Sequence, residues 1–92
     1  MKKKQMVVVT TNYRGVFYGE LASDVTPERV VLKNCRNCLR WGDAKGFLGL
    51  AAYGPGIGHR VGPAAPSITL HGITSVIECT PQAVEAWSKA SW

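Results

Sequence analysis

Three cysteines and two histidines are the residues of this 92-residue chain with the strongest potential for metal or nucleophilic chemistry. Cys35 and Cys38 form a C-x-x-C pair, and Cys79 with one histidine could complete a set of zinc ligands. A zinc site of that kind normally needs a second closely spaced pair, which this sequence lacks. The pair also lies in strand-like sequence, whereas a thioredoxin motif starts a helix. We therefore expect reduced, buried or half-buried thiols and no metal.

Recognisable catalytic groups are missing from the sequence. No serine sits in a G-x-S-x-G elbow, and the six acidic residues include no pair with an obvious catalytic spacing. His59 is followed by Arg60, whose charge opposes protonation of the imidazole, so we expect a neutral group that both donates and accepts hydrogen bonds. His71 is expected to be an ordinary polar group. The sequence thus predicts a protein that is not an enzyme and has no cofactor.

The segment 41–66, WGDAKGFLGLAAYGPGIGHRVGPAAP, holds seven of the ten glycines and three of the five prolines. A long loop in a small domain is usually functional or disordered, and the apolar content of this one argues against disorder. Basic side chains flank it, aromatic rings could stack a base, and glycine N–H groups could form an anion nest. The predicted ligand-binding residues are Arg36, Arg40, Trp41, Lys45, Tyr53, Gly54, Gly56, His59 and Arg60.

The sequence leaves the partner of this segment open. GPGIG at 54–58 is followed neither by the G-K-[ST] of a Walker A loop nor by the helix of a Rossmann fingerprint. One interpretation is a pocket for a small anionic, nucleotide-like ligand, and the other is a loop that packs against a neighbouring subunit. The net charge of +5 attracts anions of any size, from a nucleotide to RNA. Three of those charges lie in the basic tail 1–5, which could serve solubility alone.

Size and cysteine usage favour a homo-oligomer inside the cell. A chain this short builds a thin core, and disulfides or oligomerisation are the usual remedies. An odd number of cysteines without a signal peptide indicates reduced thiols and a cytoplasmic location, and no apolar run approaches a membrane span. Apolar residues of the segment are expected to form the subunit interface: Phe47, Leu48, Leu50, Ala51, Ala52 and Tyr53.

The remaining pattern predicts a mainly β domain with a C-terminal helix (α+β). Strands are expected at 6–11, at 16–23 with a bend at Gly19, and at 29–41 with a break near Asn34. Thr80 is a typical N-cap before Pro81, and Trp87 is expected to plug the open end of the sheet rather than bind a ligand. Trp92 is expected to pack on the same surface or on a neighbouring chain.

These elements make a single domain over 1–92, in which a small, strongly bent sheet or partly open barrel carries a long Gly/Pro-rich loop. Its predicted parts are the basic tail 1–5, three strands within 6–41, the binding or oligomerisation loop 42–66, one bent or two short strands within 67–80, and a helix at 81–90.

Two segments resemble the Sm-like family of small β-barrels. GVFYGELASD followed by RVVLKN resembles its second and third strands, and LHGITSVIE resembles its second motif. The resemblance implies an Sm-like or SH3-like barrel, a ring of subunits and an alternative function in binding single-stranded RNA. The family's RNA-contacting residues do not carry over, because Glu28 or Arg29 stands where the family has an Asn, and His71 replaces the basic residue before Gly72. The C-terminal helix and the long insert also depart from the family.

The chain as a whole resembles an uncharacterised family of small phage and prophage proteins. NCRNCLRWGDAKGFLGLAAYGPG, RVGPAAP and ECTPQAVEAW carry this resemblance. It implies a phage protein that acts in the host cytoplasm. By analogy with other small phage proteins, it suggests an anti-defence sponge that sequesters a host immune nucleotide signal. A structural or protein-interaction component of the phage is the further alternative.

Overall fold

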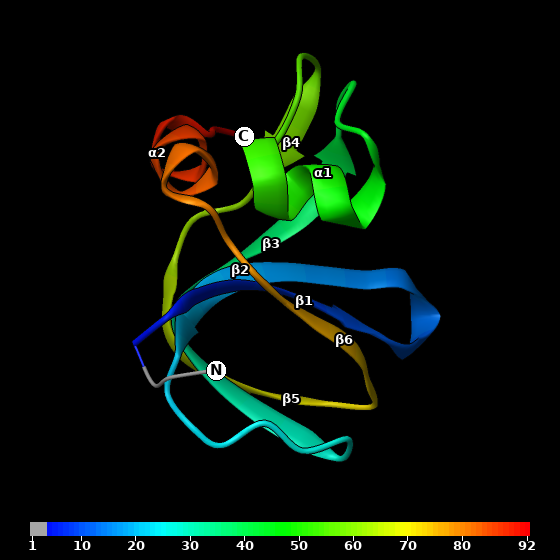
Figure 1. The fold of residues 1–92 in the computed structure, drawn as a ribbon, viewed down its shortest axis with the longest axis vertical. Helices are drawn as coiled ribbons and strands as arrows, with labels where there is room; N and C mark the ends of the chain where they lie inside the picture. The colour runs from blue at the N-terminus through cyan, green and yellow to red at the C-terminus, as the bar shows by residue number, and fades with distance from the viewer. Residues whose placement is uncertain (1–3) are drawn as a thin grey trace.

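Six antiparallel strands and two α-helices form this computed structural model, which describes residues 4–92 (Figure 1). Residues 1–3 of the predicted basic tail lie outside the described residues. A 3₁₀ turn at Asn12–Arg14 joins the first two strands. The elements are β1 Met6–Thr11, β2 Gly15–Leu21, β3 Arg29–Trp41, α1 Gly46–Tyr53, β4 His59–Val61, β5 Ala65–His71, β6 Ile73–Glu78 and α2 Pro81–Lys89.

The long strand β3 organises the sheet, whose order is β4-β3-β2-β1-β6 with β5 also paired to β3. The first half of β3 pairs with β5 and the second half with β4. Asn34 has a φ of 51° between the halves, and the register with β2 shifts around Gly19. A Cβ at Gly19 would lie 3.1 Å from the Lys33 carbonyl oxygen. The expected bend at Gly19 matches this register shift, whereas β3 continues through Asn34 as one strand, so the expected break is only a local irregularity.

The sheet is buried on both faces, so the protein has two cores. Val7, Val8 and Val9 of β1 are all fully buried although successive side chains point to opposite faces. One core, the strand core, lies inside the curved sheet and contains Val7, Val9, Leu21, Val30, Leu32, Cys35 and Leu70. The other, the helix core, lies between the sheet and the two helices and contains Val8, Val16, Tyr18, Cys38, Leu50, Ala51, Val61, Cys79, Ala83, Trp87 and Ala90.

Helix α2 confirms the predicted C-terminal helix and its buried face. The Thr80 hydroxyl accepts a hydrogen bond from the Ala83 N–H (3.1 Å), which caps the helix one residue before Pro81. Trp87 is fully buried and stacks on Tyr18 with ring centroids 4.5 Å apart. Its indole N–H donates to the Leu50 carbonyl (3.1 Å), so α2 is fixed to both the sheet and α1.

The prediction of a long loop at 42–66 is wrong, because this segment contains α1, β4 and the start of β5. The run FLGLAAY suits a helix once Leu50 and Ala51 can pack in the helix core. Gly54 ends the helix with a φ of 86°, and its N–H donates to the Leu50 carbonyl. The glycines and prolines therefore separate short elements. Burial of Leu50 and Ala51 also removes them from the expected subunit interface.

The segment 67–80 forms two strands, β5 and β6, that turn at Gly72. Within the described residues β5 pairs only with β3 and β6 only with β1, so each keeps one open edge. In residues 4–92, no helix is long and apolar enough to span a membrane.

Candidate functional site

The predicted ligand-binding residues gather at one end of the molecule, where the end of β3, α1 and β4 meet (Figure 1). Cys38 and Val61 pair across β3 and β4 and are buried in the helix core. Arg40 and Arg60 pair next, after a register shift, and are both exposed. Because Arg60 adjoins buried Val61 in its strand, it points to the opposite face. This two-stranded ribbon thus has a helix side and an outer side.

Arg36 lies on the helix side and has a structural role. Its guanidinium donates three hydrogen bonds of 2.8 Å, to the carbonyls of Gly62, Trp87 and Ala90. Two of these acceptors belong to the C-terminal end of α2, where orphan carbonyls require donors. The predicted ligand contact through Arg36 therefore fits its position poorly, because three of its five N–H donors already bind carbonyls of the fold.

The glycine-rich segment 54–58 is also tied to the protein through its N–H groups. Gly56 donates to the Trp41 carbonyl (2.8 Å), and Ile57 donates to the Asp43 carboxylate (2.7 Å). The N–H of Gly54 is used at the end of α1. Asp43 thus occupies the place that an external anion would take in the expected nest. Surface hollows of about 380 and 480 Å³ flank the segment, and the larger one is lined by Asp43, Pro55, Gly56, Ile57, Gly58, His59 and Ser91.

His59 links this segment to the end of α2. Its Nδ1 lies 2.8 Å from the Gly56 carbonyl oxygen, and its Nε2 lies 3.2 Å from the Ser91 N–H nitrogen. Because a carbonyl can only accept and a backbone N–H can only donate, these partners assign the proton to Nδ1 and leave Nε2 as an acceptor. This is the neutral donor–acceptor arrangement that the sequence predicts for His59.

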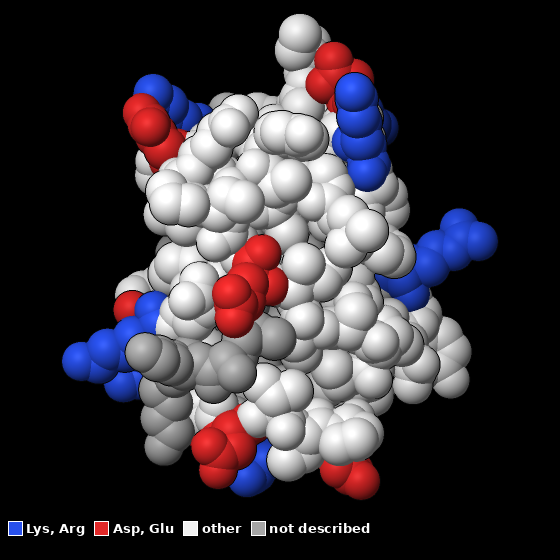
Figure 2. All heavy atoms as spheres, viewed as in Figure 1, with Lys and Arg blue, Asp and Glu red and all other residues white. Residues whose placement is uncertain are grey.

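The predicted aromatic and basic residues near α1 lie at separate places around that helix. Trp41 is half-buried, packs against the helix core and contacts the Phe47 ring at 4.8 Å between centroids. Tyr53 and Lys45 are exposed and line the smaller hollow. Figure 2 shows a largely uncharged surface over α1 and α2, with charged side chains mostly at its margin. The helix side therefore presents apolar surface more than positive charge.

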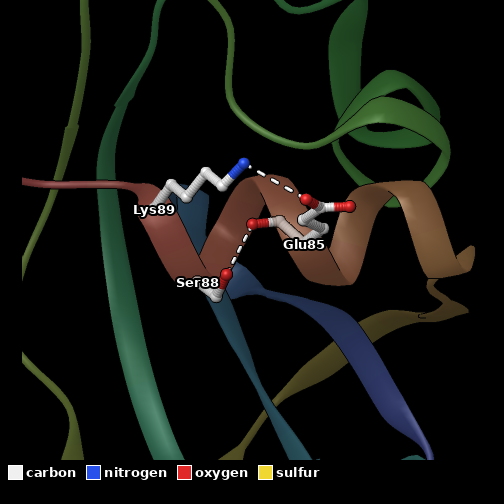
Figure 3. A network of polar contacts seen from close by, with 3 residues as sticks. All are labelled: Glu85, Ser88 and Lys89. Carbon is white, nitrogen blue, oxygen red and sulfur yellow. Dashed lines mark hydrogen bonds and ion pairs between the residues drawn. The ribbon is translucent and has the colours of Figure 1, made fainter.

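The outer side presents two arginines that have no acidic partner among residues 4–92. Arg40 and Arg60 lie directly opposite each other on neighbouring strands. Within residues 4–92 the single ion pair joins Lys89 to Glu85 on α2, at 3.1 Å (Figure 3). A shallow hollow of about 420 Å³ adjoins Arg40 and is lined by Leu39, Arg40, Trp41, Gly42 and Gly58.

Trp92 is not among the ligand-binding residues that the sequence predicts. The Arg60 guanidinium carbon lies 4.7 Å from the centroid of the Trp92 ring, which is 64% exposed. Trp92 therefore lies on an arginine and not on the apolar face of α2. Only the path of the chain after α2 could reveal this contact, because 32 positions separate the two residues.

The thiols are buried, as expected, and lie apart. Cys35 belongs to the strand core and Cys38 to the helix core, because β3 presents them to opposite faces. Burial raises the pKa of both thiols to about 11 and that of Cys79 to about 12. Protonated thiols are poor nucleophiles and poor metal ligands. Across residues 4–92, no three His, Cys, Asp or Glu side chains are grouped so that they could hold a metal ion.

A family model covers residues 4–87 of the chain, and its description is "Domain of unknown function (DUF6948)". The chain belongs to this family. The match supports the expected membership of an uncharacterised family and extends over all the strands and most of α2. No curated protein and no solved structure matches the chain.

Proposed function

We propose that this protein is a non-enzymatic binding module for a small anionic, nucleotide-like ligand that is held on the outer side of β3 and β4. The observation that carries the proposal is the unneutralised Arg40–Arg60 pair. Like charges directly opposite each other in a sheet are destabilising, and a bound anion offsets that cost. Two guanidinium groups also match the planar, bidentate geometry with which arginine binds phosphate.

The neighbouring hollow supports the proposal by its size and position. Its volume of about 420 Å³ is within the range of ligand pockets, which start at roughly 300 Å³, and Arg40 is one of its lining residues. We expect the ligand to be released chemically unchanged, because no recognisable nucleophile or general base among residues 4–92 lies beside the two arginines. Lys45, Tyr53 and His59 belong to the hollows of the helix side and are secondary candidates.

Calorimetry against a panel of linear and cyclic nucleotides tests this function. Arg60→Ala and Arg40→Ala should each weaken binding by roughly 1.5–3 kcal/mol, the range for hydrogen bonds to charged groups. Arg29→Ala is the matched control, because it removes the same charge from the exposed opposite end of β3. Equal losses of affinity in all three variants would show that the net charge of the protein, and not a specific site, accounts for the binding. Recovery of a cleaved nucleotide would identify an enzyme instead.

We also propose that the protein is a homo-oligomer. Each of β5 and β6 keeps an open edge, and such edges readily accept another strand. Helix α1 adds exposed apolar side chains, with exposed fractions of 39% for Phe47, 72% for Leu48 and 59% for Tyr53. Light scattering at micromolar concentration should report a symmetric assembly of at least a dimer. A monomer under these conditions contradicts the proposal.

Binding of single-stranded RNA is the second candidate function. The strand order β5-β3-β2-β1-β6, with a turn at Gly72 between β5 and β6, is compatible with the Sm-like barrel implied by the sequence resemblance. Arginines beside an exposed tryptophan suit a single strand as well as a nucleotide. Affinity that rises with oligonucleotide length and falls steeply with salt favours RNA, whereas affinity for mononucleotides favours the first proposal.

The phage context rests on the sequence resemblance alone. In that context the proposed ligand is a host immune nucleotide, and the protein acts as a sponge that sequesters it. Native mass spectrometry of protein purified from infected cells tests this directly, because it reports stoichiometry and any retained ligand together. A protein partner without a nucleotide favours the structural or protein-interaction alternative.

A further inference from the structure

Residues 90–92 run beside β4 as a short strap, and three contacts hold them there. The Val61 N–H donates to the Ser91 carbonyl (3.0 Å), and the Ser91 N–H donates to Nε2 of His59 (3.2 Å). The Arg36 guanidinium binds the Ala90 carbonyl. The strap thus covers an edge of β4 and brings Trp92 onto Arg60.

We infer that Trp92 is the base-stacking residue of the outer-side site, and that neutral His59 holds it in position. This inference rests on the proposed function and adds to it a stacking residue and a residue that positions it. One face of the Trp92 ring receives the Arg60 guanidinium, while 64% of the side chain remains exposed. A base that stacks on this ring lies next to Arg60, whose partner on the neighbouring strand is Arg40. Stacking of this kind accepts any base, because every base has a π face.

Trp41 is the less suitable stacking face, although the sequence favours it. It lies on the helix side of the ribbon, paired with His59, and packs against Phe47 and the helix core. Its indole therefore contributes to the fold. Trp92 occupies the outer side together with the arginines, so charge and ring belong to one surface.

His59 makes the strap sensitive to pH. A protonated imidazole carries N–H groups on both nitrogens, so Nε2 can no longer accept from the Ser91 N–H. Arg36 binds the strap from β3, and Arg60 adjoins His59 in β4 on the opposite face. Asp43 lines the same hollow as His59, but its carboxylate accepts from the Ile57 N–H. Lys89, before the strap, is paired with Glu85. Acidification should therefore detach Ser91 and release Trp92.

The strap can be tested on the free protein by NMR. The hydrogen-exchange protection of the Ser91 amide should be lower at acidic pH than at neutral pH, because a protonated imidazole cannot accept its hydrogen bond. His59→Gln should keep similar protection at acidic and at neutral pH, because its amide oxygen accepts a hydrogen bond without titrating. Amides of β1 serve as the control for global stability. Unchanged Ser91 protection in the wild-type protein, or ring ¹⁵N shifts that place the proton on Nε2, would overturn the role of His59.

The stacking role can be tested with AMP and ribose 5-phosphate as probes. Trp92→Ala should weaken AMP binding about 5- to 150-fold, which corresponds to the usual range for base stacking, and leave ribose 5-phosphate binding unchanged. Trp92→Phe should retain most of the AMP affinity. Equal loss for both probes assigns Trp92 to positioning Arg60 and overturns the stacking role. If neither probe binds the wild-type protein, the proposed function fails, whereas the Ser91 measurement still decides whether the strap exists.

Discussion

The two sides of the β3–β4 ribbon carry similar residue types, but they differ in whether the hydrogen-bond donors of those residues are bonded within the fold. On the helix side, Arg36 and the N–H groups of segment 54–58 donate to carbonyls and to the Asp43 carboxylate. On the outer side, Arg40 and Arg60 face each other and form no ion pair within the part of the chain that the structure describes. The difference lies in whether donors already have partners inside the fold. Donor-rich sequence therefore indicates a binding surface only where the protein leaves those donors free.

Tryptophan substitution should separate the two sides with the largest effect. Trp87→Ala removes a fully buried ring, its stacking on Tyr18 and its hydrogen bond to Leu50, so the free energy of unfolding should fall by about 3–5 kcal/mol. Trp92→Ala on the outer side should change it by no more than about 0.5 kcal/mol. Chemical denaturation measures both. Equal losses would show that the strap is part of the core.

Alkaline pH should destabilise the protein through its buried thiols and Tyr18. Burial raises the pKa of Tyr18 to about 12, with Cys79 adding to the effect and Arg36 opposing it, and raises the thiol values to about 11 or 12. The folded state thus favours the neutral forms. Their stabilisation is complete below the unfolded thiol pKa, near 9, and is lost as pH rises toward the folded values.

Thermal melts at about pH 8 and about pH 10 measure this loss, which should be on the order of 1 kcal/mol for each thiol. A variant with Cys35, Cys38 and Cys79 replaced by Ala should lose most of the dependence and keep ligand binding. Its stability at neutral pH should fall by at most a few kcal/mol through lost packing. The same alkaline loss in the variant would assign the effect to other groups.

Arginine substitutions on the two sides should have opposite consequences. Arg36→Ala leaves the carbonyls of Gly62 and Ala90 without this donor and removes one of the two donors to the Trp87 carbonyl, so the free energy of unfolding should fall by about 1.5–3 kcal/mol. Arg40→Ala relieves repulsion from Arg60 and should leave stability within about 0.5 kcal/mol or raise it slightly. Denaturant titration of both variants checks this. If the Arg36→Ala protein is stable but loses ligand binding, Arg36 belongs to the ligand-binding site.

Glycine substitution should sharpen the assignment of segment 54–58 to the fold. A Cβ at Gly56 would collide with the Asp43 carboxylate and lie 2.5 Å from the Ala44 nitrogen, so Gly56→Ala should cost about 1–3 kcal/mol of stability. Gly62→Ala is the control, because its Cβ would lie 3.8 Å from the nearest atom, the Asn37 oxygen. Thermal melts compare the two. Loss of ligand binding with unchanged stability in Gly56→Ala would favour the anion nest.

Strands β1, β2, β3, β5 and β6 and the C-terminal helix follow from local sequence, whereas β4 lies in the segment that the sequence predicts to be a loop. β1 and β3 have the bounds expected from the sequence, and the irregularity at Asn34 lies opposite Gly19, the glycine expected to mark a bend. Thr80 and Pro81 fix the start of α2 by capping alone. Helix α1 escaped prediction because its eight residues are dense in glycine and gain their stability from burial against the helix core. A short helix of this kind has little local signal.

For the candidate site, the sequence by itself determined the residue types and the end of the molecule where they gather. The sequence also predicts a donor–acceptor role for His59, whose partners, the Gly56 carbonyl and the Ser91 N–H, are supplied by the fold. The tertiary structure alone decided which groups are free: it directed Arg36 to the end of α2, supplied Asp43 to the glycine-rich segment and brought Trp92 onto Arg60. The physical reason is that hydrogen-bond partners distant in sequence are chosen by packing. Composition and spacing record the donors of a chain, and only the fold shows which donors are already engaged.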